Sequence, residues 1–205
     1  MRDVVQVLEA EFTRYKALGD AALAQLNDEE VSRRPPGGGN SVAIIVWHVG
    51  GNLESRFTDF LTSDGEKPWR DRDQEFEARE ATATEVVAKW ERGWRAVTDA
   101  VASLNDARLS DRVTIRGQGL SVLEALARSL AHTANHVGQI VFLGKMWRGE
   151  AWNCLSIPLG ASRAYNANPG SEKPTDHAAA VRASTPSGGG QENAGRASPE
   201  QGLAP

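Results

Sequence analysis

The sequence has only one cysteine, Cys154, in 205 residues. A single cysteine excludes an intrachain disulfide and fits a reducing compartment. The beginning of the chain has no signal-peptide pattern, because acidic residues interrupt "MRDVVQVLEAEF", and the longest apolar run, "VAIIVW", is far too short to span a bilayer. We therefore expect a cytoplasmic protein that has no membrane partner.

Blocks of positive charge are also missing. The formal net charge is -4 at pH 7, and lysine and arginine are scattered along the chain. This charge gives no bias towards polyphosphates, so we expect no nucleic acid as a partner. The chain is 40% hydrophobic and 24% charged, which suits one globular domain at this length.

The last 37 residues, 169–205, differ in composition from the rest. They contain five prolines and six glycines, and apart from alanine their only apolar side chains are Val181 and Leu203. Such a segment buries too little surface to offset the entropy lost on ordering. We therefore predict one domain over residues 1–168 and a disordered tail over 169–205, in which His177 is a bystander.

Apolar residues recur at helical spacing in four long stretches, roughly 2–26, 40–61, 82–104 and 121–147. The second stretch starts at Asn40 or Ser41, both good N-caps, and the fourth starts at Ser121 with Glu124 in a capping-box position. Between the third and fourth stretches, "RVTIRGQG" could form a short extended piece. The fold class that these patterns predict is all-α.

The connection at 62–81 is long enough to run back along a helix. When extended it reaches over about 50 Å, whereas a helix of 21 residues is about 32 Å long. The second and third helices can therefore be parallel, in a four-helix bundle with one long crossover. Trp90 and Trp94 lie on the regular apolar stripe of the third helix, so we expect them in the core rather than under a substrate.

Three of the four histidines lie in two of the predicted helices. His132 and His136 are four residues apart in "AHTANHVGQI" and therefore share a helix face, and His48 lies in "VWHVGGN" of the second helix. If these helices are neighbours, three imidazoles converge and leave coordination positions open, as a Lewis-acid metal site requires. The alternative is that they are hydrogen-bonded histidines at the rim of the core.

The segments "WHVGGN" and "HTANHVGQI" resemble the DinB-like superfamily, bacterial four-helix bundles that bind a divalent metal through three histidines. Residues 55–77 and 136–166 look like a branch of that superfamily known as a domain of unknown function. The resemblance covers residues 1–168 and implies that His48, His132 and His136 are the metal ligands. Imidazoles suit several ions, and we expect zinc first, with nickel or iron as alternatives.

Relatives in that superfamily include transferases that use bacillithiol and an isomerase that uses mycothiol. The resemblance therefore implies a small-molecule substrate and a metal that activates a low-molecular-weight thiol, or water, towards an electrophile. A second hypothesis is a metal-stabilised binding or stress-response module without turnover, which could be a homodimer. A third is a structural bundle whose histidines hold no metal.

Asn52 and Arg56 follow His48 by four and eight residues and continue its helix face. They could line the mouth of a pocket, where Arg56 would anchor a substrate carboxylate. The alternative for Arg56 is an ion pair with an acidic neighbour such as Asp59 or Glu75.

Two further segments could contribute to a site. Asp64 and Lys67 lie in the turn-forming segment "TSDGEKPW", which could contact substrate over the end of the bundle, or could be a solvated loop. Gln139 follows His136 by three residues and could orient its Nδ1–H or a metal-bound water, or could pack at the edge of the core. Cys154 has no histidine nearby, so we expect a small buried hydrophobe rather than a nucleophile.

Overall fold

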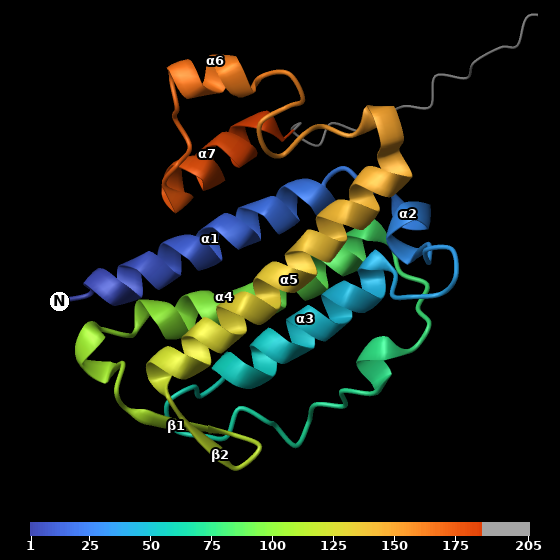
Figure 1. Cartoon of the computed structure of the whole chain (residues 1–205). Helices are drawn as coiled ribbons and strands as arrows, with labels where there is room; N and C mark the ends of the chain where they lie inside the picture. The colour runs from blue at the N-terminus through green and yellow to red at the C-terminus, as the bar shows by residue number, and fades with distance from the viewer. Residues whose placement is uncertain (186–205) are drawn as a thin grey trace, which may run out of the picture.

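The computed structural model describes residues 1–185, and this part of the chain is mostly helical, as predicted (Figure 1). The four long helices are α1 (Asp3–Leu23), α3 (Val42–Phe57), α4 (Ala83–Ala102) and α5 (Val122–Arg148). The shorter helices are α2 (Asp28–Ser32), α6 (Ser162–Ala167) and α7 (Pro174–Ser184). Single 3₁₀ turns are formed by Gln74–Phe76, Asp106–Arg108 and Gly149–Ala151. The long helices lie side by side, and none within residues 1–185 is both long and apolar enough to cross a membrane.

The predicted helix starts agree with the caps. Ser41 accepts a hydrogen bond from the backbone N–H of Ile44 at the start of α3, and Ser121 forms a full capping box with Glu124 at the start of α5. Thr82 begins α4 in the same way. The second helix ends earlier than predicted: α3 stops at Phe57, whereas the expected helix ran to about residue 61.

The core lies between the long helices. Trp90 and Trp94 are each 1% exposed, which confirms that they are core residues rather than a surface platform. Two glycines bring α3 and α4 into close contact, because a Cβ at Gly93 would lie only 2.8 Å from the Cα atom of Gly50. This contact fixes the position of α3, which carries His48.

Helices α3 and α4 run in the same direction. Both begin beside α2, since α2 packs against α3 and the N–H of Ala83 donates to Asp28 Oδ1 at 2.7 Å. Beyond the end of α3, the N–H of Gly65 donates to the carbonyl of Thr114 in the small sheet at 2.8 Å. Residues 58–82 then return to the beginning of α4 (Figure 1). This returning segment covers one side of α3.

A two-stranded antiparallel sheet lies at one end of the long helices (Figure 1). It consists of β1 (Arg112–Ile115) and β2 (Gln118–Ser121), with Ile115 opposite Gln118. The two turn residues, Arg116 and Gly117, have positive φ angles of 54° and 71°, as a tight hairpin turn requires. The extended piece allowed by "RVTIRGQG" is therefore a β-hairpin.

The prediction of a disordered tail was wrong for the part that contains α7. This helix packs against α1, with Ala178 and Val181 only 1% and 3% exposed. Pro174 stands in the first turn of the helix, where its missing N–H costs nothing. Residues 186–205 of the predicted tail lie outside the described part of the chain.

Candidate metal centre

Helices α3 and α5 bring three histidines together. His48 comes from α3, and His132 and His136 come from successive turns of α5. One nitrogen from each ring lies within 4.8 Å of the other two, and the Nε2 atoms of His48 and His132 are 3.1 Å apart. The three side chains singled out in the sequence therefore share one point in space.

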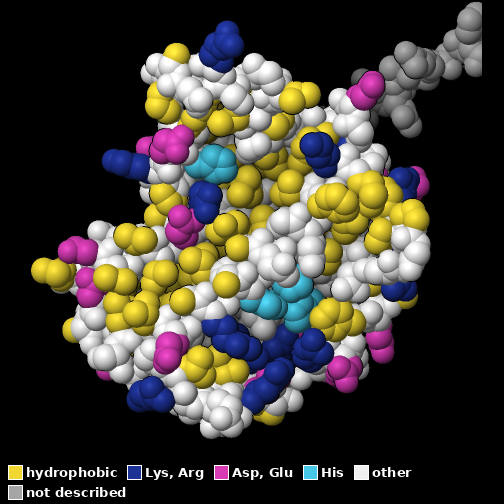
Figure 2. All heavy atoms as spheres, in the orientation of Figure 1, with side chains coloured by type: hydrophobic (Ala, Val, Ile, Leu, Met, Phe, Trp, Pro, Cys, Tyr) yellow, Lys and Arg dark blue, Asp and Glu magenta, His cyan; other side chains and the backbone are white. Residues whose placement is uncertain are grey.

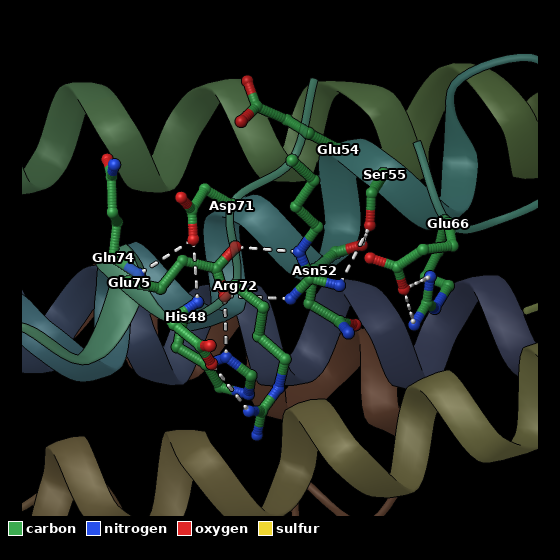
Figure 3. Close-up of polar contacts among 12 residues, drawn as sticks. His48, Asn52, Glu54, Ser55, Glu66, Asp71, Arg72, Gln74 and Glu75 are labelled. Carbon is green, nitrogen blue, oxygen red and sulfur yellow. Dashed lines mark hydrogen bonds and ion pairs between the residues drawn. The ribbon is translucent and has the colours of Figure 1, made fainter. Parts of the chain in front are cut away.

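A carboxylate in the returning segment fixes the ring of His48. Glu75 Oε2 lies 3.0 Å from His48 Nδ1 and is itself held by Arg70, whose Nε and Nη2 donate to the two carboxylate oxygens at 2.8 and 2.9 Å (Figure 3). Because an ionised carboxylate only accepts, the proton lies on His48 Nδ1. The lone pair of His48 Nε2 consequently faces His132.

Glu75 remains ionised although it is 7% exposed. Burial alone would raise its pKa, but hydrogen bonds from His48 and Arg70 and the charge of Arg70 lower the pKa below its ordinary value. The helix also leaves room for this carboxylate, because a Cβ on Gly51 would overlap Glu75 Oε1. Helix α3 thus carries His48 and, at Gly51, also leaves the space that Glu75 needs to reach it.

The other two imidazoles are kept neutral. Burial, together with the smaller effects of the neighbouring His136 and His48, lowers the pKa of His132 to about 4. Burial also lowers the pKa of His136, although a hydrogen bond from Nδ1 to Gln139 Oε1 at 2.8 Å opposes that effect. Neutral imidazoles at pH 7 offer the lone pairs that metal ligands need.

This cluster could hold a metal ion. Ligand nitrogens at 2.0 to 2.1 Å in a tetrahedral site are about 3.3 Å apart, close to the separation of the His48 and His132 Nε2 atoms. Metal-binding histidines usually donate their second ring N–H to an oxygen, as His48 does to Glu75 and His136 to Gln139. Among residues 1–185, His132 Nδ1 is buried without a hydrogen-bond partner.

A cavity of about 380 Å³ opens beside the cluster, and His48 and His132 form part of its wall. Asn52 and Arg56 also line it, one and two turns further along α3. Arg56 donates to the carbonyl of Gly65 and pairs with Glu66 at 3.3 Å, so its acidic partner is neither Asp59 nor Glu75.

Asp64 and Lys67 are not among the residues that line the cavity. Asp64 accepts hydrogen bonds from the backbone N–H groups of Arg116 and Gly117, both at 2.8 Å, and its pKa is held well below the ordinary range by backbone N–H donors, chiefly those of Glu66 and Gly117. Lys67 is 7% exposed and donates to Ser63 Oγ at 2.6 Å. Both residues thus stabilise the conformation of the segment that they belong to.

Cys154 is exposed, so the expectation of a buried cysteine was wrong.

Several residues of the site were missed in the sequence. Glu75 was considered only as a partner for Arg56, and Arg70 was not considered at all. Both lie in the charged segment between α3 and α4. This segment has no periodic pattern from which the direction of a side chain could be predicted. Arg128 lines the cavity and precedes His132 by one helical turn, so helical spacing would have found it.

A sequence model described as "Protein of unknown function (DUF1572)" matches residues 1–161. The chain belongs to this family. The DUF1572 match includes the three histidines, the returning segment and the hairpin, and it ends before α6. Neither the curated proteins nor the solved structures contain a match to the chain.

Proposed function

We propose that this DUF1572 protein is a metal-dependent transferase whose ion is held by His48, His132 and His136. The observation that carries the proposal is the convergence of three imidazole nitrogens within 4.8 Å beside a cavity, with oxygen acceptors behind two of the rings. A divalent ion in this place, zinc first and nickel or iron as alternatives, lowers the pKa of a bound thiol or water and so supplies a nucleophile at neutral pH.

We also propose that the fold is a DinB-like four-helix bundle. The close packing of α1, α3, α4 and α5 supports this, as does the return of residues 58–82 between two parallel helices. In that superfamily the substrates include low-molecular-weight thiols, and we propose the same class, or water, for this chain. The second substrate would be a small electrophile in the cavity.

The protein's own side chains have distinct tasks in this scheme. Glu75 and Arg70 hold the His48 ring with its Nε2 lone pair inwards, and Gln139 does the same for His136. Asn52 and Arg56 line the cavity next to the cluster and position the substrate.

Elemental analysis and a conjugation screen test the proposal together. Protein purified without added metal should contain about one equivalent of a divalent ion, and the His132→Ala variant should lose it. The metal-loaded protein should accelerate conjugation of a small thiol to at least one electrophile in the screen, and the variant should not. Equal rates for the two folded, metal-analysed proteins would overturn the enzyme function.

A metal-stabilised binding module without turnover is the second candidate. Two observations favour it: the histidines join α3 to α5, and no carboxylate within residues 1–185 lines the cavity to act as a general base. An ion held there would contribute to folding stability even if no reaction occurred. In that case the screen stays silent although the ion is bound.

A further inference from the structure

The cavity beside the histidines is lined by positively charged side chains, without acidic ones among residues 1–185. Within the described part of the chain its wall includes five arginines and no aspartate or glutamate. These arginines are Arg56, Arg70, Arg72, Arg116 and Arg128. Figure 2 shows a patch of lysine and arginine side chains directly beside the histidines on this face of the molecule. The protein as a whole is acidic, so this concentration of positive charge is local.

Three of the five guanidinium groups form ion pairs with carboxylates that do not line the cavity. Arg70 is held by Glu75 at 2.8 Å, and Arg56 and Arg116 share Glu66 at 3.3 and 2.9 Å. Two carboxylates therefore face three guanidinium groups. Their main effect is to fix these side chains in position.

The charges of the remaining two arginines are hardly neutralised by carboxylates. The nearest carboxylate to Arg72 is that of Asp73 at 3.9 Å, whose side chain is fully exposed, and Arg128 forms no ion pair with any residue in 1–185. Such a weak exposed pair contributes almost nothing. Both guanidinium groups are therefore free to bind a ligand.

These two arginines flank the histidine cluster from different elements. Arg72 lies over the ring of Phe76 at 4.9 Å, and that ring packs against His48 at 4.5 Å. Arg128 stands one turn before His132 on the same face of α5. A ligand bound between them would thus lie against the same imidazoles that form the cluster.

Apolar side chains form another part of the wall. Phe57, the last residue of α3, and Phe60, which follows the helix, line the cavity together with Val113 of the hairpin and Ala125 of α5. A concave site that combines like charges with apolar side chains attracts an anion that also has an apolar part. Arginine binds planar or tetrahedral oxyanions through two parallel hydrogen bonds.

We infer that the cavity binds a small anionic molecule whose carboxylate or phosphate is held by Arg72 and Arg128 and whose apolar part packs on Phe57 and Phe60. As a statement about the substrate, this inference rests on the proposed function, because it places the electrophile beside the metal ligands. As a statement about binding, it needs no ion, because the arginines alone supply the attraction.

Calorimetric titration of the metal-free full chain tests the inference. The probes are benzoate and phenyl phosphate, with benzamide as the uncharged comparison for benzoate. The variants are Arg72→Gln with Arg128→Gln, and the matched control is Arg163→Gln, an exposed arginine of α6. At least one anion should bind about tenfold or more tightly than benzamide, and the double variant should lose about tenfold or more of that affinity. The control should stay within about twofold of the native protein.

The preferred anion decides between a carboxylate and a phosphate substrate. Equal affinity for the anions and benzamide, or an unchanged affinity in a double variant with a native melting temperature, would overturn the inference. Metal analysis separates it from the proposed function. Arginine-dependent anion binding by a protein that never takes up metal supports the inference and removes the metal enzyme, whereas bound metal without anion preference does the reverse.

Discussion

Glu75 determines which nitrogen of His48 faces the other two histidines. The three histidines themselves were predictable, because four-residue spacing and neighbouring helices are visible in the sequence. Glu75 was not, because it follows His48 by 27 positions and reaches it only through the path of the returning segment. The candidate metal ligands could therefore be predicted residue by residue from the sequence, but the groups that orient them could not.

Replacing Glu75 with Gln should weaken metal binding about 10-fold to 100-fold. An amide cannot take both hydrogen bonds from Arg70 and still accept from His48 Nδ1 as a charged group does. Glu77→Gln is the matched control, because Glu77 is exposed and only two residues away. Competition with a chromophoric chelator measures both affinities, and equal values for the two variants would contradict the role of Glu75.

The stability of the metal-free protein should fall as the pH falls from 6.5 to about 4. The pKa of His132 is lowered from 6.5 to about 4 by burial and by His136 and His48, so in this window the unfolded chain binds a proton that the folded chain does not. Denaturant unfolding at several pH values measures the free energy of unfolding. The His132→Gln variant should show a smaller slope, and identical slopes would argue against the lowered pKa.

At the scale of elements, the long helices followed from apolar spacing and from caps such as Ser121. The helix α7 did not. The tail was judged by its average composition over 37 residues, and this average concealed the 11-residue segment "PTDHAAAVRAS". Alanines and one valine are enough to form an apolar helix face when α1 already offers a surface to pack against. A short helix that depends on tertiary contact leaves only a weak pattern.

Val181→Ala should lower the free energy of unfolding by about 1 to 3 kcal/mol, because it removes buried methyl groups between α7 and α1. Val7→Ala is the matched control, since Val7 is 63% exposed in α1. Chemical denaturation of both variants measures the difference. If Val181→Ala is as neutral as the control, the packing of α7 does not contribute to stability.

At the scale of the whole molecule, net charge proved to be a poor guide to the site. The chain is acidic, yet five arginines meet at one cavity from α3, the returning segment, the hairpin and α5. They are spread from Arg56 to Arg128 in the sequence, so no local window shows a basic cluster. Only the packing of elements distant in sequence brings them together, and this part of the site was beyond sequence analysis.

Binding of an ion should stabilise the whole fold, because the proposed ligands join α3 to α5. Zinc at about 100 times its dissociation constant should raise the free energy of unfolding by about 2.7 kcal/mol, and a chelator should reverse the rise. Thermal unfolding with and without zinc measures this. The His132→Ala variant should show no zinc-dependent shift, whereas His177→Ala, the histidine of α7 outside the cluster, should keep the full shift. A shift that persists in His132→Ala would mean that zinc binds elsewhere, and neither the transferase nor the metal-stabilised module could then be assigned to these three histidines.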